Sequence, residues 1–502
     1  MLNVNFPVQM MSEILGPGKG GTQVGHIEGR SREQTVMFPE ALDDYVVADN
    51  AVRVIDAWVD GQDLVGLGFA RVEPAATGRP GYDPGDLVKL YVYGYMNRVR
   101  SSRLLERETH RNVELMWLMR CLRPDFKTIA DFRKDNGKAI GGLFRQFVLF
   151  CQDQGLVAGE LVAIDGSKFV AVNNPGRNFT AEKLKGRIER LERSIGEYLQ
   201  ELNQADAAQP EAPRAEDIAR TLEHLRENQA NAQARLEQLQ ATGESQLSLT
   251  DGDARAMKTP QHGSVVGYNV QSVVDSRHKL IVEFAVTNEG NDRNQLGAMA
   301  LRTKGALGLE AFEVVADTGY ANADEVARCA QEGITTYLRA PVIPGNEARG
   351  LYGKNRFEYD PSSDSYRCPA GQVLNYQSTS QHEGRAVKLY GTLACKDCPM
   401  RAACTTSREK GRVITRPINQ DHLDAAAARA KAHPEIMRER KCLAEHPFGT
   451  LKRAWDQGYF LMRGMAKVST EISLSVLSYN LKRTISILGV QNLLAAITAR
   501  TA

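Results

Sequence analysis

The feature that most constrains the fold is a series of short runs rich in β-branched residues that begins after residue 155. Val, Ile and Thr crowd a helical backbone but fit the pleated surface of a sheet, so each run predicts a strand. Helical patterns lie between the later runs, which favours an α/β sheet with antiparallel pairs at one edge and crossover helices further on. The runs cover residues 161–172, 264–275, 280–288, 313–317 and 335–342.

The first run, LVAIDGSKFVAVNN at residues 161–174, contains Asp165 and Gly166 at its centre. Asp-Gly commonly makes a hairpin turn, so one interpretation is a pair of short strands joined there. The other is a carboxylate placed at the end of a buried strand. Asp317 repeats this arrangement in EVVADTGY. Two aspartates that end strands of one sheet can lie close together, and close carboxylates favour a hard cation such as Mg²⁺ between them.

A third acid is expected from a helix beside the sheet, and the candidate is Glu445. It lies in a basic segment that can hold a DNA backbone. An ion pair with Lys441 or Lys452, which would share its helical face, is the alternative role for this acid. Pro447 removes a helical hydrogen bond, so the helix is expected to bend or to begin near it. The cations of the segment are Arg438, Arg440, Lys441, Lys452 and Arg453.

The segment before the first strand divides into an arm and a helical region. Residues 1–45 are expected to be a flexible N-terminal arm, and residues 46–150 show a helical pattern. From Arg98 to Lys138 there are eleven Lys or Arg against six Asp or Glu. Four arginines recur at helical spacing, which predicts one basic face suited to DNA phosphates or, alternatively, a solvated face with intrahelical ion pairs. They are Arg100, Arg103, Arg107 and Arg111.

Two heptad patterns at residues 180–242 flank a breaker with Pro210 and Pro213. Apolar residues that alternate spacings of 4 and 3 predict two helices packed as an antiparallel hairpin. We interpret this hairpin as an insertion between strands and assign it no chemistry.

Four of the eight cysteines cluster as C-x26-C-x2-C-x5-C. A structural Zn²⁺ is the first interpretation, because one pair has the spacing of zinc knuckles. A [4Fe–4S] cluster and four reduced thiols are the alternatives. The other cysteines are expected to be buried apolar residues. The cluster is Cys368, Cys395, Cys398 and Cys404, and the others are Cys121, Cys151, Cys329 and Cys442.

Three segments in this order, DGSKF, DTGY and EHPFGTLKR, resemble the DDE transposases of bacterial insertion sequences. DARAMKT, GYNVQSVVD and TNEGNDRNQL are similar to segments between the first two acids of that family. YRCPAGQ with CKDCPMRAAC resembles its cysteine insert, and YNLKR its closing helix. The chain most resembles the group named for insertion sequence 1182, related to the groups of insertion sequences 4 and 5, from about residue 40 to 490.

The resemblance implies an RNase H-like catalytic domain with a mixed sheet over residues 155–490, preceded by an all-helical DNA-binding domain. The hairpin at 180–242 and a Cys-rich metal-binding insert at 345–415 would interrupt this domain. Asp165, Asp317 and Glu445 fall on the catalytic triad, which holds two Mg²⁺ ions, with Mn²⁺ as an alternative. Lys452 falls on a lysine seven residues after the glutamate. Arg438 and Lys441 replace the Tyr and Arg of many relatives, although both can contact phosphate, as can Arg453.

The implied activity is binding of terminal inverted repeats in double-stranded DNA, cleavage of the DNA ends and transfer of the 3′-hydroxyl to target DNA. A homodimer on paired ends and a bacterial cytoplasmic, nucleoid-associated location are implied as well. A Mg²⁺-dependent nuclease without strand transfer, and an inactive DNA-binding descendant, are the alternatives.

Length and composition set weaker limits. A chain of 502 residues predicts two or three domains, and the net charge of +2 is uninformative as a total. No apolar run approaches the roughly 18 residues of a membrane span. The start of the sequence lacks a basic region followed by an apolar core, so we expect neither a membrane segment nor a secretion signal.

Overall fold

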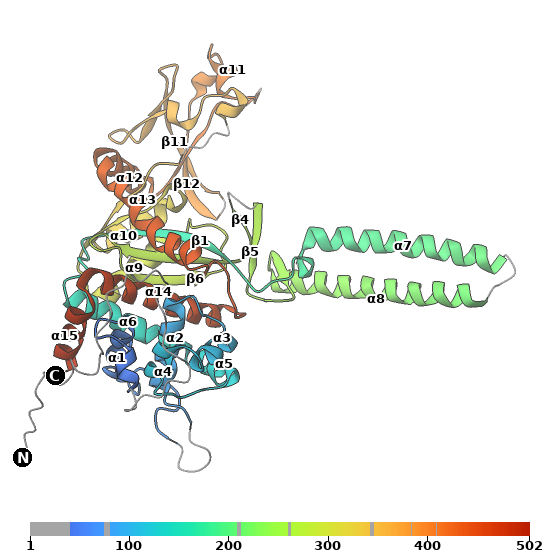
Figure 1. The fold of residues 1–502 in the computed structure, drawn as a ribbon. Helices are drawn as coiled ribbons and strands as arrows, with labels where there is room; N and C mark the ends of the chain where they lie inside the picture. Colours follow the sequence, from blue (N-terminus) through green and yellow to red (C-terminus); the bar gives the residue numbers. More distant parts are fainter. Residues whose placement is uncertain are drawn as a thin grey trace, which may run out of the picture.

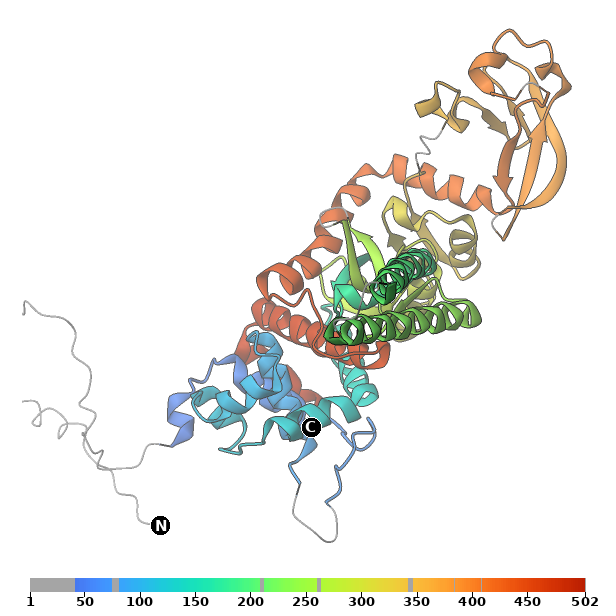
Figure 2. The ribbon, with the colours of Figure 1, turned by 90° about the vertical axis from the view of Figure 1, so that its right-hand side faces the viewer.

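The computed structural model describes seven stretches of the chain, which form a mixed α/β structure. They are residues 41–74, 81–207, 212–259, 263–341, 346–382, 384–407 and 409–501. The predicted N-terminal arm lies outside these stretches apart from residues 41–45. Figures 1 and 2 show a helical body at one end, a central sheet, a smaller sheet at the other end, and a long helix pair that projects sideways.

The helical body is built around one completely buried helix. Every residue of α2 from Pro84 to Met96 is buried. The long helix α14 (Met465–Leu488), near the C-terminal end, packs against α2, α6 and the central sheet. The buried apolar residues of the body and of the sheet form one continuous cluster, so no gap in the core separates them at about residue 150. The other helices of the body are α1 (Ala51–Asp60), α3 (Ser102–Thr109), α4 (Val113–Leu118), α5 (Phe126–Asp135), α6 (Gly137–Asp153) and α15 (Val490–Thr501).

The central sheet has the strand order β4-β5-β1-β7-β8, and β6 also pairs with β5. β4 and β6 pair with β5 in antiparallel fashion, as does β1, whereas β7 runs parallel to β1 and β8 parallel to β7. The bounds are β1 (Leu161–Val170), β4 (Arg255–Thr259), β5 (Gly263–Asp275), β6 (Ile281–Thr287), β7 (Phe312–Val315) and β8 (Ile334–Tyr337).

Asp165 and Gly166 do not form a turn, so the hairpin interpretation of the first run is wrong. β1 continues through both residues and pairs with β5 in unbroken register, with Asp165 opposite Ser272 and Gly166 opposite Gln271. A Cβ at Gly166 would lie 2.4 Å from Asp292 Oδ1 and 2.4 Å from Gln271 Nε2. The glycine is therefore required by a close approach of side chains to the strand and not by turn geometry.

Helices cover both faces of the central sheet. On one face, α9 (Leu296–Leu307) and α10 (Ala323–Gln331) contribute to the large core; α9 has no counterpart in the sequence prediction. On the other face lie α12 (Gln420–Ala432) and α13 (Pro434–Phe448). Because side chains alternate along a strand, Ala163 of β1 faces α13 whereas its neighbours Val162 and Ile164 face the large core.

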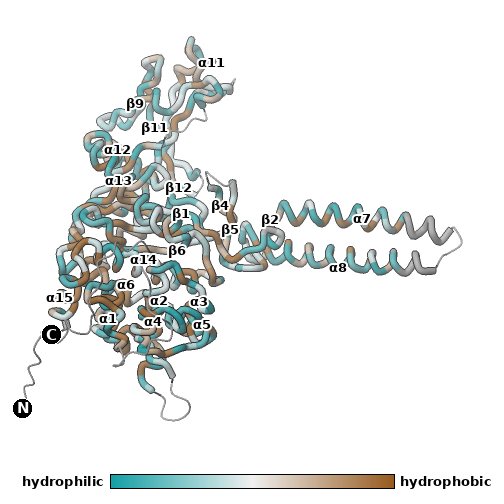
Figure 3. Tube along the Cα trace, in the orientation of Figure 1, coloured by the Kyte–Doolittle hydropathy of each residue, from teal (hydrophilic) through white to brown (hydrophobic). Residues whose placement is uncertain are grey.

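The projecting pair consists of α7 (Ala181–Ala207) and α8 (Ala212–Thr242), which the heptad segments form. The two helices pack on each other, and a short sheet of β2 (Asn178–Thr180) and β3 (Gln246–Ser248) closes their base. A small cluster with Leu184, Ala232 and Leu239 lies between them. Figure 3 shows this pair as largely hydrophilic, whereas hydrophobic segments concentrate in the body.

The smaller sheet lies at the far end of the molecule and has five antiparallel strands in the order β13-β12-β11-β10-β9. We call it the cysteine-bearing sheet, because Cys368, Cys395, Cys398 and Cys404 lie in its connections. Its strands are β9 (Glu358–Asp360), β10 (Ser365–Arg367), β11 (Val373–His382), β12 (Arg385–Gly391) and β13 (Ile414–Pro417), and its short helix is α11 (Arg401–Cys404).

Candidate active site

Asp165 lies within β1 and points toward α13, since it is two residues beyond Ala163 on the same face of the strand. Its side chain is half-buried, and its Oδ1 accepts a hydrogen bond of 2.9 Å from the backbone N–H of Gly166. Burial and the neighbouring Asp317 carboxylate raise the pKa of Asp165 to about 6, against the opposing effect of the Gly166 N–H and Arg440. An acid in this state favours a cation beside it.

Asp317 follows β7 and lies at the level of Asp165. The parallel register sets Val315 opposite Ala163, and each acid comes two residues later. Adjacent strands lie about 4.8 Å apart, so the two carboxylates occupy neighbouring positions on one face of the sheet. Asp317 caps a 3-10 turn, Thr318–Tyr320, where its Oδ1 accepts a hydrogen bond of 2.7 Å from Gly319 N.

Glu445 belongs to α13, the helix that covers these strands. The two residues before it, Leu443 and Ala444, are buried in a cluster with Ala163 and Val315. The Glu445 side chain itself is exposed, beside this contact. No ion pair joins it to Lys441 or Lys452 among the described residues, so the ion-pair alternative is not supported.

Pro447 does not start the helix. α13 begins at Pro434 and runs through Pro447 to Phe448, and a π-helical turn, Gly449–Ala454, follows directly. A proline lacks the N–H of the helical ladder, and a widened turn is one way in which a helix accommodates such a break.

The structure thus brings Asp165 and Asp317 together and sets Glu445 on the helix that packs above them. Within the described stretches, no group of three or more His, Cys, Asp or Glu side chains is arranged to hold a metal ion. This applies to the three acids and to the cysteines alike.

Lys452 is directed inward, toward the strand that carries Asp165. Its Nζ donates hydrogen bonds to Ser167 Oγ at 3.1 Å and to Lys168 O at 2.7 Å, and it lies 5.1 Å from the centre of the Phe169 ring. Burial lowers the pKa of Lys452, with Arg453 and Lys168 adding to the effect. Lys452 therefore fastens the π-helical turn to β1. Arg438, Lys441 and Arg453 are exposed.

The predicted arginine stripe of the helical body is partly wrong. Only Arg103 and Arg107 lie in α3, because the helix ends at Thr109. Arg100 precedes the helix and is buried, where its guanidinium donates to Tyr459 O at 2.9 Å and to Asp456 O at 3.3 Å. Arg111 follows the helix and pairs with Glu108. Arg103, Arg107 and Arg111 are exposed, so three of the four arginines can still meet a ligand.

A further carboxylate, Asp292, lies beneath β1 and was not singled out by the sequence. Its Oδ1 accepts hydrogen bonds of 2.6 Å from both Asn269 Nδ2 and Gln271 Nε2, and Lys168 Nζ lies 3.3 Å from its Oδ2. Gln271 in turn accepts a hydrogen bond from Tyr320, three residues after Asp317. One polar network therefore supports both segments that carry the acids. In the sequence, Asp292 follows the run LIVEFAVT by five residues, whereas Asp317 directly ends its run, so the strand-end pattern does not mark Asp292.

Arg440, one cation of the basic segment, has no individual role in the sequence prediction but lies near the carboxylates in the structure. It lies on α13 and is close enough to lower the pKa of Asp165. Its side chain is half-buried and has no hydrogen bond or ion pair within the described chain. Arg440 is therefore a cation without an ion-pair partner in the described chain that acts on the Asp165 carboxylate.

The four clustered cysteines line one small hollow in the cysteine-bearing sheet. Burial raises the pKa of the Cys404 thiol, and the three other cysteines add to this rise. Outside the cluster, Cys151 and Cys329 are buried as expected, but Cys121 and Cys442 are exposed, so that prediction is wrong for two of the four. In α13, Leu443 packs against the central sheet, and its neighbour Cys442 is exposed on a different side of the helix.

Two protein families match parts of the chain. The family described as "Transposase DDE domain" matches residues 367–485, and the one described as "Transposase domain (DUF772)" matches residues 40–135. These matches support a DDE transposase. The first contains Glu445, Lys452 and the four clustered cysteines, and the second contains Arg100, Arg103, Arg107 and Arg111. Asp165 and Asp317 lie outside both, so their assignment depends on the geometry above.

Among solved structures, the chain is similar to "Cryo-EM structure of piggyBac transposase synaptic complex with hairpin DNA (SNHP)". The identity is 10%, the TM-score 0.24, and the match covers 88% of this chain and 81% of the other. No curated protein matches the sequence. Within the described stretches, no helix has both the length and the apolar character that a membrane crossing needs.

Proposed function

We propose that this chain is a DDE transposase of the group named for insertion sequence 1182, which cuts the ends of its own element and joins them to target DNA. The observation that carries the proposal is the register that sets Asp165 and Asp317 side by side, beneath the helix that bears Glu445. The strand order of the central sheet supports an RNase H-like domain. The two family matches support the transposase class.

The donor set suits divalent cations. Asp165 and Asp317 are close like charges: burial and the Asp317 carboxylate raise the pKa of Asp165, and Arg440 opposes this rise only in part. Together with Glu445 they would hold two Mg²⁺ ions, or Mn²⁺ in their place. When bound, such ions activate the attacking hydroxyl and stabilise the charge on the leaving oxygen of the phosphodiester.

The chain itself would supply the DNA contacts. Arg438, Lys441 and Arg453 are exposed on the same segment as Glu445 and can bind phosphates next to the scissile bond. Arg103, Arg107 and Arg111 would bind terminal DNA on the helical body. Lys452 would act from the interior by holding the π-helical turn on β1. Arg100 would join the helical body to residues 456–459 and not contact DNA.

Zn²⁺ in the cysteine-bearing sheet belongs to the same proposal. Four thiols around one hollow are a donor set that Zn²⁺ accepts. Metal analysis and a visible absorption spectrum distinguish Zn²⁺ from an iron–sulfur cluster and from free thiols. A homodimer on paired ends and action on a bacterial chromosome are part of the proposal as well.

The test is Mg²⁺-dependent nicking of a plasmid that carries the DNA flanking the coding region. Asp165→Ala and Glu445→Ala are expected to reduce cleavage by at least about 10³-fold, since loss of metal-ion stabilisation costs several kcal/mol. Binding to terminal DNA should stay nearly intact in both variants. Glu439→Ala removes an exposed acid from the same helix and serves as the control that keeps activity.

Full cutting by either variant would refute the assignment of the acids. Cleavage without joining of pre-cleaved ends would identify a nuclease, and DNA binding without any cleavage a non-catalytic descendant.

A further inference from the structure

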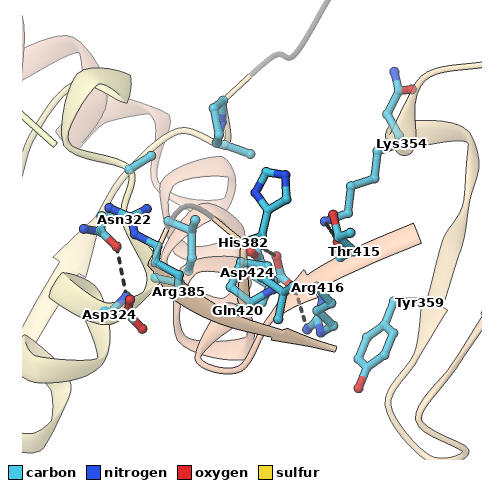
Figure 4. A pocket seen from close by; sticks show the side chains of 18 of the residues that line it. Asn322, Asp324, Lys354, Tyr359, His382, Arg385, Thr415, Arg416, Gln420 and Asp424 are labelled. Atoms are coloured by element: carbon cyan, nitrogen blue, oxygen red, sulfur yellow. Dashed lines mark hydrogen bonds and ion pairs between the residues drawn. The ribbon is translucent and has the colours of Figure 1, made fainter. Parts of the chain in front are cut away.

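A cleft of about 650 Å³ lies between the central sheet and the cysteine-bearing sheet. Figure 4 shows Asn322, Asp324 and Arg385 on one side, Lys354, Thr415 and Tyr359 on the other, and Gln420 and Asp424 of α12 between them. We call it the inter-sheet cleft. Ligand sites occur preferentially at such boundaries between structural units.

Lys354 is a cation in this cleft without a carboxylate partner. Its Nζ donates to Thr415 O at 2.8 Å, and it forms no ion pair within the described chain. Burial and the nearby guanidinium of Arg416 lower the pKa of Lys354, against the opposing effect of Asp424. Arg416 itself is satisfied, because it is paired with both Asp421 and Asp424.

Two arginines on the opposite side are also uncompensated. Arg385 donates one hydrogen bond of 3.3 Å, to the neutral amide oxygen of Asn294. Arg293 is exposed and lines the cleft without a side-chain partner in the described chain.

Acids in the cleft offset these cations only in part. Asp424 is already paired with Arg416, and Asp324 accepts a hydrogen bond of 2.8 Å from the amide of Asn419. Glu347 is an exposed residue of the lining. Three cations without ion pairs therefore face two acids without ion pairs, and the cations lie on both sides of the space.

The cleft lies within a short chain distance of the carboxylates. Ala321 and Asn322 line it, and they follow Asp317 by four and five residues. Five residues span at most about 18 Å of chain. Arg293 likewise follows directly on Asp292. A polymer held at the carboxylates can therefore reach the cleft within a few repeats of about 3.4 Å.

We propose that the inter-sheet cleft binds the phosphodiester backbone of the DNA strand that leaves the carboxylates, with Lys354, Arg385 and Arg293 as its phosphate contacts. The inference rests on the proposed function and extends it by assigning a second DNA contact, away from the scissile bond. Phosphate contacts of this kind position the strand without reading its sequence.

The experiment measures the affinity of the full chain for a fluorescently labelled DNA duplex over a range of salt concentrations, without added Mg²⁺. Removal of one phosphate-binding cation makes the slope of log affinity against log salt shallower by about 0.9. Lys354→Met and Arg385→Ala are each expected to make the slope shallower by about that amount, and Lys354→Arg to keep it. Arg367→Ala is the matched control, because it removes an exposed arginine of the same sheet that does not line the cleft.

Slopes for Lys354→Met and Arg385→Ala that equal the slope for Arg367→Ala would overturn the cleft assignment. If the unaltered chain nonetheless binds and cuts DNA, the proposed function is retained and only the assignment of the inter-sheet cleft is refuted. If the unaltered chain does not bind DNA, both proposals fall together.

Discussion

The two sheets of this molecule are stabilised in different ways. In the central sheet, β5 has an unbroken run of buried residues from Tyr268 to Val274, and helices cover both faces. In the cysteine-bearing sheet, β11 buries only Leu374 of its ten residues. The buried core of that sheet has five residues, Phe357, Tyr366, Leu374, Tyr390 and Ile414. Burial of apolar surface accounts for the stability of the first sheet but is scarce in the second.

A polar network compensates in part for this small core. Asp364 accepts hydrogen bonds from Tyr390 Oη at 2.6 Å, Tyr359 Oη at 2.7 Å and Lys388 Nζ at 2.9 Å. These hydrogen bonds lower the pKa of Asp364 to about 2. The carboxylate of Asp364 is thus fully compensated, whereas that of Asp165 is not. Under the proposed function, a metal would serve chemistry at the first sheet and folding at the second.

The largest effect is expected when the cysteines are altered. Cys398→Ser should remove the proposed Zn²⁺ and destabilise the cysteine-bearing sheet by at least about 3 kcal/mol, because a structural metal contributes directly to folding. Hydrogen exchange should show reduced protection in β10 to β12 and unchanged protection in β1 and β5. Cys121→Ser, at an exposed cysteine outside the cluster, is the control. Unchanged protection throughout Cys398→Ser would mean that both sheets fold without a metal.

A smaller effect is expected from Gly166→Ala in the central sheet. The added Cβ would lie 2.4 Å from Asp292 Oδ1 and Gln271 Nε2 and would displace the polar network beneath β1. Overpacking of this kind costs about 1–3 kcal/mol, which denaturant unfolding measures. Gly186→Ala, in α7 with nothing within 4 Å of the new Cβ, should not destabilise the chain. Equal stabilities of the two variants would show that the Asp292 network tolerates displacement.

The smallest effect is a pH-dependent difference in the free energy of unfolding between Asp165→Asn and the unaltered chain. Because the pKa of Asp165 is raised in the folded state from 3.8 to about 6, its stabilising contribution is full below about pH 4 and is lost as the pH rises through about 6. The shift corresponds to at most about 3 kcal/mol, and solvent screening of this half-buried side chain reduces it. In metal-free buffer, Asp165→Asn should therefore be more stable by about 1–2 kcal/mol at pH 8 and show no gain at pH 4.

For Asp364→Asn, we expect the change in folding stability to have the opposite sign. The lowered pKa of Asp364 contributes stability above about pH 4 that is lost as the pH falls through about 2, so this variant should be less stable at neutral pH. Thermal unfolding at several pH values measures both variants. If both variants are more stable than the unaltered chain at pH 8, the two carboxylates do not differ in how well the fold compensates their charge.

Part of this architecture was predictable because it is encoded locally. Runs of β-branched residues indicated the main strands, and the heptads indicated α7 and α8. The course of β1 was not predictable, because an Asp-Gly pair occurs both in hairpin turns and within strands. Only the pairing of β1 with β5 distinguishes the two. Asp292 was missed for a related reason, since its contacts with Asn269 and Gln271 depend on the tertiary fold. The inward direction of Arg100 and Lys452 is likewise set by carbonyl groups distant in sequence.

The most direct test of the account is a calorimetric titration of the full chain with Mn²⁺, in place of Mg²⁺, at neutral pH. We predict one or more sites whose affinity for Mn²⁺ falls at least about tenfold, or 1.4 kcal/mol, in both Asp165→Asn and Asp317→Asn but not in the control Glu439→Gln. Binding of Mn²⁺ by the two aspartate variants with the affinity of the unaltered chain would contradict it.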